Sequence, residues 1–247
     1  MIGNETVLGV ILARGGSKGI PKKNLQTLAR RPLIAWTIDA GLDARTIDRL
    51  VLSSDDEEIM QEARDRGCEV PFRRPDALAR DDSTSMEALL HVLDHVGGFD
   101  WVVLLQPTSP LRVADDIDDA LQQCIDRGAP ACVSVTPVEE PPQWMYTLTD
   151  REQLRPLLDG PRPSRRQNAT TAYVLNGAVY AARIPWLRNT GDFISSETVA
   201  HAMPVERSAD VDTKLDLRWC DFLLRSARPL SVSISKGSED SEVRQHP

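Results

Sequence analysis

The stretch VLGVILARGGSKGIPKKN, residues 7–24, joins an apolar run to a loop that is rich in glycine and in positive charge. The run at 7–12 is typical of a buried strand, whereas the three glycines, one proline and four cations that follow it suit neither a strand nor a helix. The cations are Arg14, Lys18, Lys22 and Lys23. Because a glycine-rich backbone and lysines together suit a polyphosphate, the stretch predicts an anion-binding loop after a first strand. A flexible turn with solvated lysines is the alternative.

Outward from this stretch, apolar runs alternate with amphipathic helical patterns through the first half of the chain. The pattern predicts strands at 6–13, 49–54, 69–72, 101–106 and 131–136, and helices near 33–44, 56–66, 84–96 and 114–127. Strands that are apolar throughout and separated by helices require a parallel sheet covered on both faces. We therefore predict an α/β fold with a doubly wound, mostly parallel sheet, whose ligands bind beyond the carboxyl ends of the strands.

The regular pattern breaks at 137–172, which contains six prolines and no clear period. A segment of this length between strands is usually a functional loop or a small subdomain. Regular structure resumes at 172–182, at 200–206 and in a helix near 213–226, and the polar stretch at 229–247 is typical of a disordered tail. The sequence predicts one domain at 1–228 with an insert at about 137–172.

Composition excludes several classes of function. The chain has 37 acidic and 29 basic residues and a net charge of -8, which argues against nucleic-acid binding. No run approaches the roughly 20 apolar residues of a membrane span. The four cysteines are widely scattered, so neither a disulfide framework nor a zinc site is indicated, and we expect a cytoplasmic protein.

Three further motifs carry polar side chains that suit a ligand site, a helix cap or a turn. Asp210 and Asp212 stand at i and i+2 and would point the same way in an extended segment, which suits Mg²⁺, but Asp212 is also a candidate N-cap for the following helix. In RRPDALARDDSTS, residues 73–85, Ser83 or Ser85 is a candidate cap of the next helix. QPTSPLR, residues 106–112, predicts a rigid turn that presents polar groups to a ligand or merely connects a strand to a helix.

Six motifs occur in the order and at the spacing of a known family. They are ARGGSKGIPKKN, SSDDEEI, RRPDALARDDSTS, LLQPTSPLR, YVLNGAVY and DVDTKLDL. From about residue 7 to 225 the chain resembles the cytidylyltransferases that activate sialic acid and related nine-carbon acid sugars, the CMP-acylneuraminate synthetases. The resemblance implies a Rossmann-like nucleotidyltransferase fold, a homodimer, and Mg²⁺ with Mn²⁺ as a substitute. It also implies the reaction of CTP with an acid sugar to give a CMP-sugar and pyrophosphate; an eight-carbon octulosonate as the sugar, or a homologue without turnover, is the alternative.

The resemblance also implies roles for individual residues. Catalysis would involve Arg14, Lys18, Lys23 and Asp212, with Asp210 and Asp212 binding the metal. The nucleotide would contact Arg14, Gly15, Ser17, Lys18, Lys23, Asn24, Arg74 and Ser85. The sugar would contact Gln106, Thr108, Ser109, Arg112, Trp144, Arg166 and Asn176. Lys22 matches no functional position of the family.

The chain departs from the family pattern in the insert and after it. Trp144 stands in the part of the insert where sialic-acid enzymes tend to carry a lysine, and Val174 stands where an arginine is common. Arg166 is then the better candidate to pair with the sugar carboxylate. Trp144 favours a more apolar substrate such as legionaminic or pseudaminic acid, or it anchors the dimer interface that the insert forms in the family.

Overall fold

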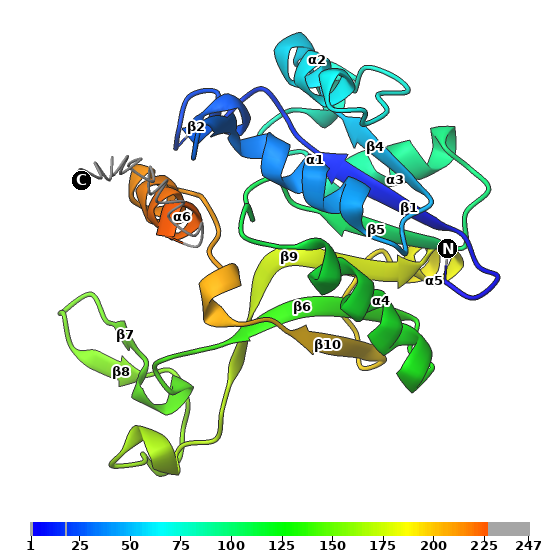
Figure 1. Cartoon of the computed structure of the whole chain (residues 1–247). Helices are drawn as coiled ribbons and strands as arrows, with labels where there is room; N and C mark the ends of the chain where they lie inside the picture. The colour runs from blue at the N-terminus through cyan, green and yellow to red at the C-terminus, as the bar shows by residue number, and fades with distance from the viewer. Residues whose placement is uncertain (1, 18, 227–247) are drawn as a thin grey trace, which may run out of the picture.

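Six strands form the central sheet of the computed structural model, which describes residues 2–17 and 19–226. Their order across the sheet is β10-β6-β9-β5-β1-β4 (Figure 1). The strands are β1 (Val7–Leu12), β4 (Arg49–Ser53), β5 (Trp101–Leu105), β6 (Ala131–Pro137), β9 (Tyr173–Arg183) and β10 (Thr198–Ala202). β9 runs antiparallel to both of its neighbours, and the other pairs are parallel. The predicted mostly parallel α/β sheet is confirmed.

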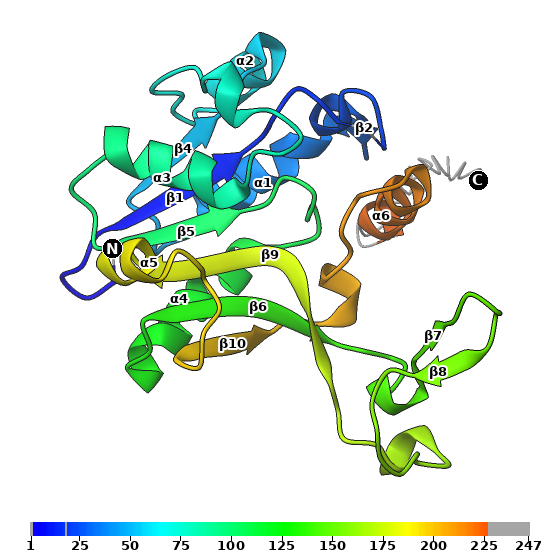
Figure 2. The ribbon, with the colours of Figure 1, turned by 180° about the vertical axis from the view of Figure 1, so that it is seen from behind.

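Helices cover both faces of this sheet, as its apolar strands require. One hydrophobic core contains residues of α1 (Leu33–Asp43), α2 (Glu57–Asp65) and α4 (Ala114–Arg127). The core on the opposite face contains residues of α3 (Ser85–His95) and α5 (Ile184–Thr190). Figure 1 shows α1 and α4 before the sheet, and Figure 2 shows α3 and α5 from the other side. The side chains of each strand alternate between the two cores, because successive residues of a strand point to opposite faces of the sheet.

A third, smaller core joins the two ends of the chain. It contains Ile20 from the N-terminal loop, Leu111, Val211, and Cys220 of α6 (Lys214–Ser226). α6 also packs against β2 (Thr27–Leu28), which forms a short hairpin with β3 (Arg31–Pro32). This core therefore brings the glycine-rich loop close to the segment that carries the two aspartates.

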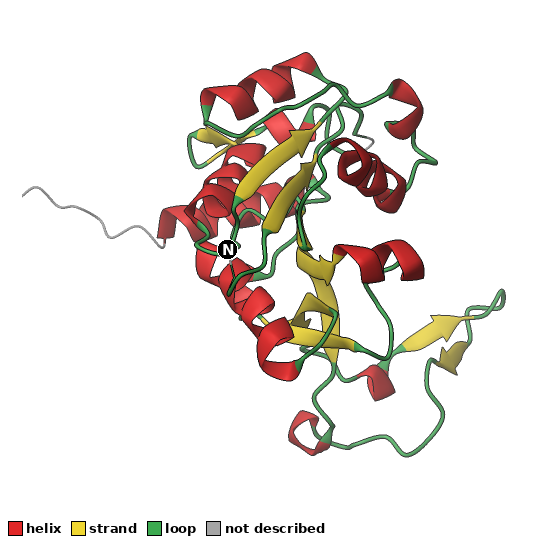
Figure 3. Ribbon diagram, turned by 90° about the vertical axis from the view of Figure 1, so that its right-hand side faces the viewer, coloured by secondary structure: helices red, strands yellow, loops and turns green. Residues whose placement is uncertain are grey.

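The insert leaves the sheet between β6 and β9 with the predicted bounds. It contains a hairpin of β7 (Tyr146–Leu148) and β8 (Leu154–Pro156), preceded and followed by the 3-10 turns Pro142–Trp144 and Arg166–Asn168. Figure 3 shows this hairpin projecting from the rest of the molecule. The predicted roles of the insert in dimerisation and sugar contact stay predictions.

Two sequence-based expectations differ from the structure. Residues 69–72 form no strand: isolated bridges join Glu69 to Val51 of β4 and Arg73 to Ser54 just beyond it, and Pro71 between them has no N–H to give a continuous ladder. The strand expected at 200–206 is β10, which ends at Ala202 because Pro204 follows. The short helix α5 and the two small hairpins have too few residues for a periodic signal.

Some expectations lie outside the described residues, namely those for Lys18 and for the tail at 229–247. Within residues 2–17 and 19–226, no helix has the length and the apolar character that a bilayer crossing needs.

Candidate active site

A cavity of about 350 Å³ opens at the carboxyl ends of β1 and β5, where a parallel sheet is expected to bind its ligand. Nine of the residues predicted from the sequence line it: Arg14, Ser17, Lys23, Asn24, Ser85, Gln106, Thr108, Asp210 and Asp212. The fold thus brings the N-terminal loop, the QPTSPLR turn and the Asp210–Asp212 segment to one place.

Side chains close the loop after β1 into a fixed shape. The N–H of Gly15 donates to Oδ1 of Asp55 at 3.0 Å, and Nδ2 of Asn24 donates to the carbonyl oxygen of Arg14 at 3.0 Å. Asn24 is 7% exposed, and its Oδ1 has no hydrogen-bond partner among the described residues. The amide nitrogen of Asn24 therefore fixes the loop, while its Oδ1 is buried without a partner among the described residues.

Arg14 reaches across the cavity mouth to the segment before α3. Its Nη1 donates to the carbonyl oxygen of Arg80 at 3.0 Å and lies 3.1 Å from Oδ1 of Asp81. The sequence analysis predicted no contact of Asp55 or Asp81 with the basic loop, although Asp55 lies within the SSDDEEI motif and Asp81 within RRPDALARDDSTS.

Lys23 connects the loop to the far end of the chain. Its Nζ donates to the carbonyl oxygen of Val211 at 2.9 Å and to Oδ1 of Asp212 at 3.0 Å. The backbone approaches closely at Gly19 as well, where an added Cβ would lie 2.7 Å from the carbonyl oxygen of Asp212. The cationic loop and the aspartate pair are therefore in direct contact.

The structure decides between the two interpretations of Asp212. The helix that follows is capped by Thr213, because Oγ1 of Thr213 accepts the N–H of Asp216 at 3.3 Å and Oδ2 of Asp216 accepts the N–H of Thr213 at 2.7 Å. The carboxylate of Asp212 faces Lys23 and the cavity instead. The N-cap alternative for Asp212 is wrong.

The surroundings of Asp210 raise the pKa of its carboxyl group. The nearby protein removes water from the group, although the side chain reaches solvent, and the charge of Asp212 raises the pKa further. A hydrogen bond from Thr108 opposes these two effects. A cation between the two carboxylates would relieve this repulsion.

The donor set fits one small divalent cation. Among residues 2–17 and 19–226, no group of three or more His, Cys, Asp and Glu side chains could hold a metal by itself. Mg²⁺ does not need such a group, since one or two carboxylates with substrate phosphates and waters complete its octahedron. Asp210 and Asp212 can therefore hold Mg²⁺ together with an anionic ligand.

A second cavity of about 270 Å³ adjoins the first and shares Arg14 and Ser85 with it. Arg74 lies in its wall, 4% exposed, and its Nε donates to Oγ of Ser53 at 3.1 Å. Burial lowers the pKa of Arg74 to about 10, which the charge of Asp55 opposes. The structure thus places Arg74 and Ser85 together, as the prediction of a nucleotide site requires.

The helix next to this second cavity begins with a cap that the sequence analysis misplaced. Neither Ser83 nor Ser85 caps α3. Thr84 does so, in a reciprocal pair with Glu87: Oγ1 of Thr84 accepts the N–H of Glu87 at 3.1 Å, and Oε2 of Glu87 accepts the N–H of Thr84 at 2.8 Å. Thr84 has the three-residue spacing that the motif needs, and Ser85 is consequently left to face the cavities.

Only part of the QPTSPLR turn lines the first cavity. Gln106 and Thr108 line the first cavity, whereas Ser109 and Arg112 are 1% and 2% exposed and do not. Nη1 of Arg112 donates to the carbonyl oxygens of Gln106 at 3.3 Å and Ala178 at 3.0 Å. The structure gives Arg112 a scaffold position beneath the turn, in place of the predicted sugar contact.

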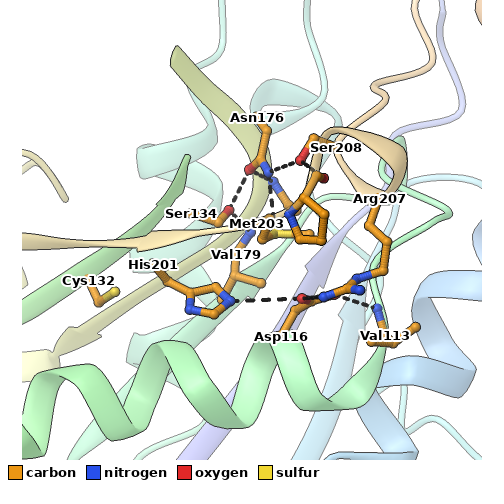
Figure 4. A network of polar contacts seen from close by, with 12 residues as sticks. Val113, Asp116, Cys132, Ser134, Asn176, Val179, His201, Met203, Arg207 and Ser208 are labelled. Carbon is orange, nitrogen blue, oxygen red and sulfur yellow. Dashed lines mark hydrogen bonds and ion pairs between the residues drawn. The ribbon is translucent and has the colours of Figure 1, made fainter. Parts of the chain in front are cut away.

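Three residues predicted to contact the sugar lie away from this cavity. In the insert, Nε1 of Trp144 donates to the carbonyl oxygen of Pro163 at 2.8 Å, and Nη2 of Arg166 pairs with Glu140 at 2.6 Å. Asn176 is 6% exposed and uses its whole amide within the protein (Figure 4). In this structure Asn176 is a structural residue, because its polar atoms already have protein partners.

Comparisons with known proteins agree with this geometry. A family model described as cytidylyltransferase matches residues 8–155, more than half of the chain. The N-acylneuraminate cytidylyltransferase of Streptococcus agalactiae serotype III is 34% identical over 209 residues, 84% of this chain and 50% of that protein. The CMP-N,N'-diacetyllegionaminic acid synthase of Legionella pneumophila is 33% identical over 229 residues, 88% of this chain and 96% of that protein. The pseudaminic acid cytidylyltransferase of Campylobacter jejuni is 32% identical, with 88% and 96% covered.

The chain spans about half the length of the Streptococcus agalactiae relatives that it matches. Among solved structures, a CMP:2-keto-3-deoxy-manno-octonic acid synthetase complexed with CTP superposes with a TM-score of 0.68, covering 90% of this chain and 99% of the other. At 18% identity this likeness shows the shared fold.

The contact at Gly19 generates a prediction. In Gly19→Ala the new Cβ must displace the backbone of Asp212, so we expect the free energy of unfolding in urea to fall by about 1–3 kcal/mol. Gly16→Ala is the matched control, because an added Cβ there meets nothing within 4 Å, and it should stay within about 0.5 kcal/mol of the parent. Equal stability of the two variants would contradict the close approach.

Proposed function

The chain belongs to the cytidylyltransferase family, and we propose that it transfers CMP from CTP to the anomeric hydroxyl of a nonulosonic acid and releases pyrophosphate. The observation that carries the proposal is the cavity in which Arg14 and Lys23 face Asp210 and Asp212. Cations for a triphosphate and a carboxylate pair for its metal are the two things that nucleotidyl transfer needs from a protein.

Different residues have different roles in the proposed reaction. The anomeric oxygen attacks the α-phosphorus, the bond from that phosphorus to the bridging oxygen of the β-phosphate breaks, and the hydroxyl proton passes to solvent. Arg14, Lys23 and, on the family resemblance, Lys18 stabilise the negative charge that moves onto pyrophosphate. Gln106 and Thr108 lie on the wall of the same cavity, where the sugar would approach.

Asp210 and Asp212 are the residues that we propose to hold Mg²⁺, with Mn²⁺ as a substitute. Bound there, the metal supplies positive charge to the triphosphate. Before CTP binds, Asp212 is paired with Lys23 and Asp81 with Arg14. The triphosphate would therefore compete with protein carboxylates for these cations, which weakens its binding and favours release of the pyrophosphate product.

The second cavity, with Arg74 and Ser85, is our proposed site for the cytidine. The acid sugar is proposed from the two relatives that this chain matches over nearly their whole length. They are named for pseudaminic acid and diacetyllegionaminic acid. All four cysteines are free, which suits a reducing compartment, and we propose a cytoplasmic location.

The substrate assignment is tested by pyrophosphate release. We expect release with CTP and Mg²⁺ in the presence of a nine-carbon acid sugar, and little with UTP, GTP or ATP. Crossing the four nucleotides with legionaminic, pseudaminic, N-acetylneuraminic and eight-carbon octulosonic acids identifies the sugar. Release with octulosonic acid alone would establish the alternative substrate, and no release with any sugar would leave a nucleotide-binding protein without turnover.

The metal assignment is tested by Asp212→Asn, which keeps the shape of the side chain and removes its charge. We expect kcat/KM to fall by more than about 100-fold and the Mg²⁺ requirement to rise, since a metal contributes several kcal/mol to charge stabilisation. Glu206→Gln is the control, because it removes an exposed carboxylate from the same segment. Unchanged turnover of Asp212→Asn at limiting Mg²⁺ would remove the assignment.

We also propose that the insert forms a homodimer contact. Its support is the apolar surface of the hairpin: Leu148 and Leu154 pair across the two strands and are 68% and 66% exposed, and Leu157, which follows the second strand, is 52% exposed. Apolar side chains gathered in this way usually mark an interaction surface.

Sedimentation tests this contact. In the double variant Leu148→Glu and Leu154→Glu, two charges face each other at the hairpin surface, so we expect the dimer to dissociate at micromolar protein concentration. Leu42→Glu, on α1 and 44% exposed, is the control and should leave the mass unchanged. A double variant that sediments as the parent dimer would place the interface elsewhere.

A further inference from the structure

The turn that precedes Asp210 is tied to α4 by a two-pronged ion pair. Arg207, in the 3-10 turn Val205–Arg207, donates from Nε to Oδ2 of Asp116 at 3.0 Å and from Nη2 to Oδ1 at 2.7 Å (Figure 4). Asp116 is 1% exposed, and its Oδ2 also accepts the N–H of Val113 at 3.0 Å, at the start of α4. Both ends of the pair are therefore fixed in orientation.

Asp116 stays ionised in this position and so requires a cation. Burial alone raises the pKa of Asp116, but the contacts from His201 and Arg207 and the N–H of Val113 outweigh it and lower the pKa to about 2. His201 lies farther away, with Nε2 at 3.8 Å from Oδ1, so Arg207 makes the close contact. A buried carboxylate holds such a partner firmly, because losing it would leave an unpaired charge.

A second tie holds the next residue of the same segment. Oγ of Ser208 accepts Nδ2 of Asn176 at 2.9 Å and donates to the carbonyl oxygen of Pro204 at 2.7 Å. Asn176 is itself fixed, because its Oδ1 accepts Oγ of Ser134 at 2.6 Å (Figure 4). The segment is thus attached to β9 and β6 immediately after its attachment to α4.

The third tie lies between the two aspartates. The N–H of Val211 donates to the carbonyl oxygen of Thr108 at 2.8 Å, and the side chain of Val211 is fully buried. Only Ala209 and Asp210 separate this point from Ser208. With so little chain between fixed points, the positions of both carboxylates depend on where the turn at 205–208 is held.

We propose that Arg207 is a positioning residue for the metal-binding aspartates, acting through Asp116 of α4; the inference rests on the proposed function of Asp210 and Asp212. Arg207 does not line the cavity, and its guanidinium group faces Asp116 instead. Its effect is to keep the two carboxylates in one arrangement, so that metal binding does not have to order the segment.

Arg207→Lys tests the proposal, because lysine keeps the charge near Asp116 but cannot make the two-pronged contact. We expect the free Mn²⁺ concentration that half-saturates the CTP complex, measured by electron paramagnetic resonance, to rise about tenfold. kcat should fall by a similar factor while the KM for the acid sugar stays within twofold. Amide hydrogen exchange at 208–212 should become about tenfold faster without CTP or metal.

Arg183→Lys is the matched control. Arg183 makes a comparable pair with Glu5, at 2.6 and 3.1 Å, and neither residue contacts the 203–212 segment. We expect this variant to lower the melting temperature but to leave Mn²⁺ binding and the exchange at 208–212 unchanged.

The outcomes separate this inference from the proposed function. Exchange at 208–212 in Arg207→Lys equal to that of the parent would overturn the positioning role, whether or not the protein turns over CTP. Equal changes in Arg207→Lys and Arg183→Lys would also overturn it, because the effect would then be general destabilisation. Faster exchange confined to Arg207→Lys, in a parent that releases no pyrophosphate, would support the tie and contradict the proposed reaction.

Discussion

The ammonium group of Lys23 joins segments from opposite ends of the chain, and the candidate active site depends on that contact. It binds the carbonyl oxygen of Val211 and the carboxylate of Asp212, which are 188 and 189 residues away in sequence. The side chain of Lys23 is 16% exposed and that of Asp212 is 74% exposed, so water screens the pair from the Asp212 side. The small core around Ile20, Val211 and Cys220 supports the contact, because it packs the two segments against each other. Gly19 then permits the close approach that a side chain would prevent.

Charge compensation is a second theme of the site. Each basic group that faces the cavity in the described part of the chain has an acidic or carbonyl partner: Arg14 has Asp81 and Arg80, and Lys23 has Asp212 and Val211. Such pairs reduce the cost of gathering cations at a strand edge in the absence of an anion. In the proposed reaction a triphosphate would exchange partners within the site, so the strength of its binding would reflect a difference between two sets of contacts. Coupling of this kind would suit the release of pyrophosphate.

Several polar residues that resemble ligand-binding groups in sequence are structural in the folded protein. Asn176 binds Ser134 where the β6–β9 ladder shifts register. Gly177 beside it has a φ of 74°, a backbone conformation that favours glycine. Arg112 holds backbone carbonyls beneath the QPTSPLR turn. The amide of Asn176 is fully used within the protein, which leaves it no atom for a substrate, whereas Nε and Nη2 of Arg112 have no hydrogen-bond partner among the described residues. Arg207 is the opposite case. No sequence motif indicated a role for it, yet its ion pair with Asp116 fixes the turn that precedes Asp210.

The sequence by itself determined the alternation of strands and helices and the place of the insert, because periodicity and composition are local properties of the chain. The pairing of a cationic loop with two aspartates was an expectation from the family resemblance. The antiparallel direction of β9, the loss of a strand at 69–72 and the cap at Thr84 were decided by neighbours and by single-residue geometry. The same holds for the candidate site. Sequence supplied Arg14, Lys23, Asp210 and Asp212, but only the tertiary structure distinguished Asp212 from a helix cap and Asn176 from a cavity residue. The physical reason is that a polar group's role depends on which atoms surround it after burial, and those atoms come from distant parts of the chain.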